Sequence, residues 1–148
     1  MSTIQIKRLG LEEWELAGQL FGLMAEVFEE ERAPLSAEYL GRLLRLDWFW
    51  ALAAFRGDEL VGGLTAYVLP LTRVEASEVF IYDLAVREEY QRQGIGRLLM
   101  AAVQEQARAE GIPDLFVPAD NEDEHAIDFY HAIGWEASAV TFFTAGSG

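Results

Sequence analysis

The feature that most constrains the fold of this chain is a strand, a glycine turn and a helix in direct succession. Residues 78–86 form an apolar run that predicts a strand, and an apolar stripe at helical spacing extends from Gly94 to Glu110. The turn before the helix, residues 91–96, has the sequence QRQGIG. Glycines let backbone N–H groups approach a ligand closely, and a helix N-terminus presents unpaired donors. The pattern therefore favours a cradle for a pyrophosphate group.

The charge near this turn strengthens the prediction. Arg87, Arg92 and Arg97 form a basic island in a chain whose net charge is -14, and an anionic cofactor needs such an island. The alternative is that the glycines only turn a corner and the arginines are solvated, because two glycines before a helix are a weak signal alone. The spacing matches neither a Walker A loop, which needs Gly-Lys-Ser/Thr, nor a Rossmann fingerprint.

The composition excludes several classes of function. With 25 acidic and 11 basic residues, the chain would repel nucleic acid and anionic membranes, whereas a cationic small molecule suits it. The alternative is that the acidic composition serves only to keep the protein soluble. The absence of cysteine excludes disulfides and thiol nucleophiles, and two histidines give no basis for a metal site. Without a signal-peptide pattern or an apolar stretch of about 20 residues, we expect a cytoplasmic protein.

The periodicity predicts one α/β domain over residues 1–148, with a mixed sheet and helices on both faces. Ser36 is the expected N-cap of the second helix, and residues 56–59 are the expected turn of a hairpin. The expected strands are residues 3–8, 48–55, 60–69, 78–86, 114–118 and 138–144, and the expected helices are residues 11–28, a short segment after Ser36, 94–110 and 123–133. The element order is β-α-α-β-β-β-α-β-α-β.

Two segments resemble the motifs of the Gcn5-related N-acetyltransferase (GNAT) superfamily. Leu84-Ala85-Val86, Tyr90 and residues 91–96 are similar to its central motif, and residues 126–135 (AIDFYHAIGW) are similar to its second motif. Glu88 departs from the pattern, since many members carry proline there. The resemblance implies the acyl-CoA N-acyltransferase fold, with a mostly antiparallel twisted sheet, and acetyl-CoA as cosubstrate. It implies a cofactor site formed by Leu84, Ala85, Val86, Gln91, Arg92, Gln93, Gly94, Ile95, Gly96 and Arg97.

The same resemblance assigns the chemistry, because in this superfamily the acceptor amine attacks the thioester directly. It implies that the strand 78–86 splays from its neighbour, with N–H groups near Ala85 and Val86 polarising the thioester carbonyl. Tyr130 matches a tyrosine that protonates the leaving thiolate, a role that suits a phenol with an ordinary pKa of about 10. The alternative for Tyr130 is packing on the core.

Asp83 is the expected general base for the amine. A carboxylate within the apolar run 78–86 is costly unless it is paired or used, and burial would raise its pKa toward a useful value. The structural alternatives for Asp83 are pairing with an arginine or capping a bulge. Glu78, at the entrance of the strand, is a reserve base.

Other segments indicate the acceptor. Residues 39–45, 51–55, 66–70 and 77–86 resemble the small aminoglycoside 3-N-acetyltransferases. This implies a gentamicin-like polycationic acceptor, antibiotic resistance as the consequence, and a substrate site containing Tyr82, Asp83, Asp120, Asp123 and Glu124. The alternative for the last three is a solvated loop before a helix. The loop 26–32 is a candidate opposite wall.

Alternative functions are acetylation of a polyamine or a protein amine, and non-catalytic acyl-CoA sensing. A polyamine would need fewer acids in one place, and a peptide would need an open groove. A homodimer is compatible with the sheet edges and with the tryptophan-rich segment 48–50.

Overall fold

The computed structural model describes residues 3–146 of the chain. The chain divides into two compact units, Met1–Pro118 and Ala119–Gly148. Among the described residues, no helix combines enough length and apolar character to cross a membrane.

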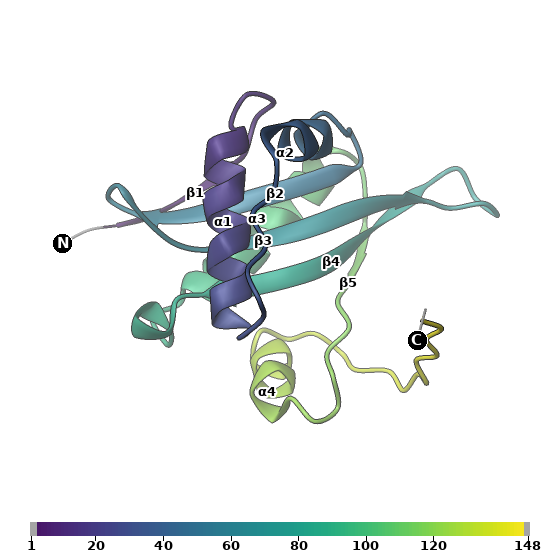
Figure 1. Ribbon diagram of the computed structural model, residues 1–148. Coiled ribbons are helices and arrows are strands. Elements are labelled where there is room, and N and C mark those ends of the chain that lie inside the picture. The colour runs from purple at the N-terminus through teal and green to yellow at the C-terminus, as the bar shows by residue number, and fades with distance from the viewer. Residues whose placement is uncertain (1–2, 147–148) are drawn as a thin grey trace. The chain divides into compact units, whose positions relative to one another are not determined.

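The first unit is built on a five-stranded sheet with the order β1-β2-β3-β4-β5 (Figure 1). Strands β1 to β4 pair antiparallel, and β5 pairs parallel to β4. The expected mixed, mostly antiparallel sheet is therefore confirmed. The strands are β1 (Ile4–Arg8), β2 (Phe49–Arg56), β3 (Glu59–Pro70), β4 (Ser77–Val86) and β5 (Asp114–Phe116), and the helices of this unit are α1 (Trp14–Val27), α2 (Ala37–Leu44), the 3-10 helix η1 (Glu88–Tyr90) and α3 (Ile95–Ala109).

Local sequence signals account for several element boundaries. The Ser36 hydroxyl accepts a hydrogen bond from the Tyr39 N–H at 3.1 Å and caps α2, as expected. The β2–β3 hairpin turns at Gly57, which has φ 62°, a left-handed conformation that favours glycine. Helix α1 begins at Trp14 and not at the expected Leu11, because residues 11–12 form a turn before the helix.

Helices cover both faces of the sheet. Helices α1 and α2 lie on one face, where Leu20, Leu23 and Leu40 form a buried cluster with Phe49 and Ala51 of β2 (Figure 1). The alternate β2 residues belong to the opposite face, which α3 covers through contacts with β1 to β4. Strand β2 is buried on both faces, which explains its nearly continuous apolar sequence.

The second unit contains one helix, α4 (Glu124–Ala132), within its described residues. Asp123 caps this helix, since its Oδ1 accepts a hydrogen bond from the Ala126 N–H at 3.1 Å. The strand expected at residues 138–144 is absent, so that prediction was wrong. Val140, Phe142 and Phe143 are exposed by 78% to 89% there. A strand needs a partner for its ladder of hydrogen bonds, and no described strand pairs with this segment.

Candidate active site

A β-bulge in β4 decides which face of the sheet carries Asp83. Thr65 of β3 pairs with Asp83, whereas the next residue, Ala66, pairs with Ile81, so Tyr82 is an extra residue in β4. Side chains normally alternate between faces, and a bulge breaks this alternation. The pairs place Asp83 on the same face as Thr65, and therefore on the face that α1 and α2 cover. Without the bulge, Asp83 would belong to the α3 face.

Asp83 is partly buried. Among the described residues, the only charged side chain that shifts its pKa is another acid, Glu30. Burial raises the pKa of Asp83, and the carboxylate of Glu30 raises the pKa further, while a hydrogen bond from Thr65 lowers it. The Thr65 hydroxyl donates to Oδ2 of Asp83 at 3.2 Å. None of the ion pairs among residues 3–146 includes Asp83, so the alternative of pairing with an arginine is not observed. The net effect is a raised pKa, which suits a carboxylate that accepts a proton.

Glu30 belongs to the loop between α1 and α2, and its effect on the pKa of Asp83 brings this loop to the site. The sequence suggested the acidic loop 26–32 as a wall of the substrate site. Glu26 and Val27 instead belong to α1, and the role of the remaining loop as a wall stays a prediction. Thr65 was missed, because a threonine in an apolar strand gives no sequence signal for a carboxylate partner. Tyr82 is 60% exposed and its ring lies 5.9 Å from that of Tyr67.

Strands β4 and β5 separate after three residue pairs. Their ladder joins Glu78–Phe80 to Asp114–Phe116 and ends there. From Ile81 to Val86, β4 therefore has no partner on its β5 side within the described chain. Backbone groups on this edge are left for a ligand or solvent. The splay expected for this strand is observed, and it begins next to Tyr82 and Asp83.

The turn after β4 leaves a row of donors at the start of α3. Arg92 and Gly94 both have left-handed backbones, with φ 65° and 84°. Within the part of the chain that the structure describes, the backbone N–H groups of residues 92–97 donate no hydrogen bond. A Cβ added at Gly94 would point into open space. Unpaired donors and the positive end of the α3 dipole suit the phosphates of a cofactor.

The turn is anchored to the start of β3. The Arg87 N–H donates to the Val61 carbonyl at 2.8 Å, and its Nε donates to the Leu60 carbonyl at 2.9 Å. The Tyr90 hydroxyl donates to Glu59 at 2.6 Å. The guanidinium of Arg87 thus faces β3 and not the turn, so the expected basic island consists of the exposed Arg92 and Arg97.

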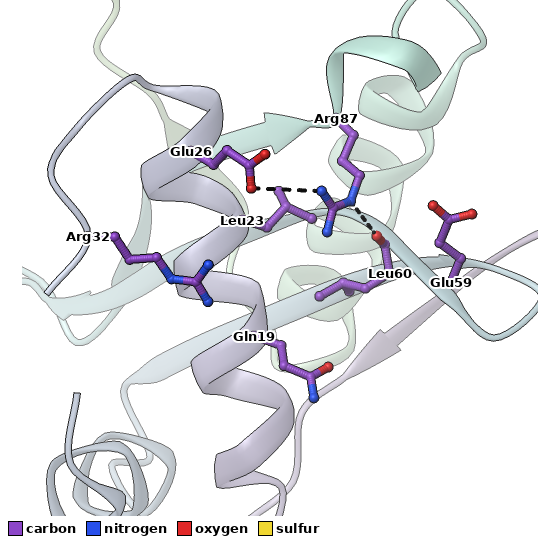
Figure 2. A pocket seen from close by; sticks show the side chains of 7 residues that line it. All are labelled: Gln19, Leu23, Glu26, Arg32, Glu59, Leu60 and Arg87. Atoms are coloured by element: carbon purple, nitrogen blue, oxygen red, sulfur yellow. Dashed lines mark hydrogen bonds and ion pairs between the residues drawn. The ribbon is translucent and has the colours of Figure 1, made fainter. Parts of the chain in front are cut away.

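A hollow of about 300 Å³ lies beside Arg87 (Figure 2). Its lining comprises Gln19, Leu23, Glu26, Arg32, Glu59, Leu60 and Arg87. The sequence had indicated Arg87 for the basic island and the loop 26–32 for the substrate wall, but not the other lining residues. Arg87 lies 4.0 Å from Glu26 across it. Helix α1 carries Gly22 here, and a Cβ at that position would overlap the Arg32 guanidinium. The hollow therefore owes part of its shape to one glycine.

Tyr130 belongs to the second unit and packs among aromatic rings. Its ring centroid lies 5.3 Å from that of Phe129 and 6.4 Å from that of Trp135. Burial, followed by the charge of Asp123, raises the pKa of Tyr130 to about 12. This differs from the expected ordinary pKa of a phenol, because the sequence does not reveal the desolvation. The phenol keeps its proton at neutral pH.

The three acids expected in the substrate site shape the loop before α4. Asp120 accepts a hydrogen bond from the Glu122 N–H at 3.0 Å, and Asp123 caps the helix. Glu124 lies in the first helical turn, where its charge complements the dipole. The structural alternative is thus observed for Asp120 and Asp123, and their role toward an acceptor stays a prediction.

The splayed strands, the donor row and the half-buried carboxylate are the features of one class of protein. The chain belongs to the acetyltransferase (GNAT) family, whose family model matches residues 14–135. The resemblance seen in the sequence is confirmed.

More particularly, the chain is similar to an aminoglycoside acetyltransferase, meta-AAC0020, from an uncultured soil metagenomic sample. The two are 35% identical over 97% of each chain, with a TM-score of 0.91, and that protein has been solved with trehalose and with sisomicin. The uncharacterized N-acetyltransferase YvbK of Bacillus subtilis (strain 168) is 32% identical over 87 residues, which are 59% of this chain and 53% of YvbK.

A third relative is the [Ribosomal protein bS18]-alanine N-acetyltransferase of Escherichia coli (strain K12). It is 27% identical over 79 residues, which are 53% of this chain and 52% of the relative. The chain therefore spans about half the length of the curated relatives it matches.

Proposed function

We propose that this chain is an acetyl-CoA-dependent N-acetyltransferase that acetylates an amine of a polycationic aminoglycoside, and the 3-amine in particular. The observation that carries the proposal is Asp83. A bulge places this carboxylate on the same face of the sheet as Thr65, in the part of β4 that has left β5. Its pKa is raised by burial and by Glu30. A base with a raised pKa and an acidic neighbour suits the capture of an ammonium group and its deprotonation.

The residues of the turn fit the cosubstrate. The free N–H groups of residues 92–97 and the open space at Gly94 suit a pyrophosphate, and the exposed Arg92 and Arg97 add positive charge. The backbone of residues 84–86, on the unpaired edge of β4, suits the arm that carries the thioester. Gln91 is fixed by a hydrogen bond from its side-chain amide to the Val86 carbonyl at 2.9 Å. When bound, acetyl-CoA supplies an activated acetyl group.

The protein groups then handle two protons. Asp83 accepts the proton of the acceptor ammonium, which leaves a neutral amine with a free electron pair. Tyr130 is the proposed proton donor to the leaving thiolate. Its pKa of about 12 keeps the phenol protonated, so that it is present as a donor at neutral pH, although as a weaker acid than an exposed tyrosine. Acetylation removes one positive charge from the acceptor, and the proposed consequence is antibiotic resistance.

The similarities support an aminoglycoside over a protein amine. The aminoglycoside acetyltransferase solved with sisomicin matches nearly the whole chain, whereas the ribosomal-protein alanine acetyltransferase matches about half of it at lower identity. A net charge of -14 also favours a polycation. Tyr82 beside Asp83, and the loop acids Asp120, Asp123 and Glu124, are the proposed acceptor contacts. The supply of acetyl-CoA suits a cytoplasmic location.

The test is thiol release from acetyl-CoA with gentamicin, sisomicin, spermidine, a lysine peptide and a peptide with an N-terminal alanine. Rapid turnover of the two aminoglycosides, with the acetyl group located on the 3-amine by NMR, is the expected result. Turnover of spermidine or a peptide alone would overturn the acceptor assignment and leave the family reaction. Turnover of none of these acceptors would favour a sensor.

Asp83→Ala separates chemistry from cofactor binding. We expect this variant to bind coenzyme A with unchanged affinity and to lose most of kcat, because the ammonium keeps its proton. Asp58→Ala is the matched control, since Asp58 lies in the exposed hairpin turn between β2 and β3. Normal kcat in Asp83→Ala would remove Asp83 as the base.

A further inference from the structure

Four aromatic rings form a continuous surface on the sheet face that carries Asp83. Tyr67 pairs with Phe80 across β3 and β4, and Phe80 pairs with Phe116 across β4 and β5. The Phe80 and Phe116 rings are stacked, with centroids 4.9 Å apart and planes inclined by 11°. Tyr82 lies 5.6 Å from Phe80 and 5.9 Å from Tyr67. Tyr67, Phe80, Tyr82 and Phe116 are called the aromatic floor below.

Helices α1 and α2 of the first unit leave part of this end of the face exposed. Toward the other end of the same face, α1 packs against small residues, and Leu20 lies so close to Gly63 that no Cβ fits between them. The floor instead keeps Tyr82 60% and Phe116 39% exposed. Trp48 extends it, with its ring 6.1 Å from that of Tyr67. A contiguous exposed apolar patch with polar residues at its rim is typical of an interaction or ligand-binding surface.

Carboxylates lie at both ends of the aromatic floor. Asp83 and Glu30 lie at one end. At the other end, Glu78 pairs with Asp114, each two residues before a floor phenylalanine and therefore on the same face. Along β4, Asp83 and Glu78 are separated by about 13–16 Å at the usual rise of about 3.3 Å per residue. A flat apolar surface between two acidic ends complements a ligand with ammonium groups at both ends.

We propose that the aromatic floor, together with Glu78 and Asp114, is an extended acceptor subsite that binds a second amino-sugar ring. The proposal rests on the proposed function, in which the reacting amine lies at Asp83. The apolar face of a sugar ring packs on the rings, and its ammonium groups gain cation–π attraction and pair with Glu78 and Asp114. The site therefore selects rigid multi-ring polycations over flexible polyamines, which must lose more conformational freedom on binding.

The test compares a multi-ring acceptor with a single-ring acceptor. Sisomicin has several rings, and 2-deoxystreptamine is a single diamine ring that reaches Asp83 but not the far end of the floor. Phe116→Leu keeps apolar bulk and removes the flat ring. We expect it to lower kcat/KM for sisomicin about tenfold, through KM, and to change that for 2-deoxystreptamine less than twofold. Glu78→Gln should also lower kcat/KM for sisomicin more than for 2-deoxystreptamine. In this variant kcat/KM for sisomicin should depend less on salt concentration than in wild type.

Trp14→Ala is the control for Phe116→Leu, because Trp14 has the same exposed fraction, 39%, and lies at the start of α1. Its kcat/KM should match wild type for both acceptors, and thermal denaturation of every variant reports folding. Equal losses for sisomicin and 2-deoxystreptamine in Phe116→Leu, or no loss for either, would overturn the subsite.

Failure of the proposed function gives a different result. If wild type acetylates no aminoglycoside, the proposed function fails, and calorimetry of sisomicin binding in the presence of coenzyme A decides the subsite on its own. Weaker binding in Phe116→Leu than in wild type supports the subsite without catalysis. No binding to wild type, or equal binding to the two proteins, rejects it.

Discussion

Thr65→Val tests the environment of Asp83 without touching the carboxylate. Thr65 is 4% exposed, and its hydroxyl is a donor to Asp83 at 3.2 Å. Valine has nearly the same shape, so the packing of β3 is preserved, but its methyl group cannot donate. The hydrogen bond lowers the pKa of Asp83, while burial and Glu30 raise it. Removal of the donor therefore leaves only the two causes that raise the pKa.

The expected magnitude is about one pH unit. A hydrogen bond to a charged group contributes about 1.5–3 kcal/mol, and one pKa unit corresponds to about 1.4 kcal/mol. The distance of 3.2 Å is long for an O–H···O bond. The lower end of the range therefore applies. Because Asp83 must be ionised to accept a proton, activity falls as the pH decreases through its pKa.

The assay is kcat/KM for the best acceptor as a function of pH, which reports groups of the free enzyme. We expect the acidic limb of Thr65→Val to move up by about one unit, so that the rate falls about tenfold at a pH below both limbs and is unchanged on the plateau. Thr72→Val is the matched control, since Thr72 lies in the exposed loop between β3 and β4. Asp83→Asn identifies the group that causes the acidic limb, because the pH profile of this variant should have no such limb.

The pH dependence of folding stability is an independent check on the pKa of Asp83, because a raised pKa fixes the direction of the change. The pKa of Asp83 in the folded chain lies above its ordinary value of 3.8, so its contribution to stability is complete below 3.8 and is lost as the pH rises through the folded value. Thr65→Val should therefore lower the Tm at neutral pH more than at pH values below 3.8. If Asp83→Asn lacks the acidic limb but Thr65→Val has it at the wild-type pH, the reasoning about Thr65 is refuted.

The remaining predictions concern backbone space and one phenol. Gly94→Ala should weaken coenzyme A binding and lower stability by about 1–2 kcal/mol, measured by titration and denaturation, because φ is 84° although the Cβ meets nothing. Gly63→Ala should destabilise by about 2–3 kcal/mol, since its Cβ would lie 2.7 Å from the Leu52 carbonyl. By contrast, Gly41→Ala, with an ordinary 3.5 Å contact inside α2, should stabilise by up to about 1 kcal/mol in denaturant unfolding. The phenolate absorbance of Tyr130, identified by subtraction of Tyr130→Phe, should titrate near pH 12, and the stability that this group contributes should be lost between its ordinary value of 10 and about 12.

Locally encoded features were predictable from the sequence. Ser36 caps α2, Gly57 turns the first hairpin, and the glycine turn precedes α3, because each depends on a few neighbouring residues. The segment 138–144 shows the limit of the same reasoning. Its composition is typical of a strand, but a strand also needs a partner with unpaired backbone groups, and composition does not supply one.

The site depended on pairing between distant residues, which the sequence does not give. Asp83 was predicted from the cost of a carboxylate in an apolar run, but its hydroxyl partner Thr65 lies 18 residues away in the chain. The position of Tyr82 as a bulge follows from the β3–β4 register, and no local pattern indicates it. The hollow beside Arg32 depends on Gly22. In the sequence this glycine indicates only a residue of low helix propensity.

The two halves of strand β4 contribute to different parts of the site, and the single extra residue at Tyr82 lies between them. Before the bulge, β4 is held by β5 and contributes Phe80 to the aromatic floor. After it, β4 is free on that side and leads to the donor row at α3. Because the bulge also returns Asp83 to the face of the aromatic floor, the carboxylate lies beside the acceptor surface and within the free edge, which begins at Ile81. Without the bulge, Asp83 would face α3. The bulge thus joins an acceptor surface to a cofactor edge at Asp83.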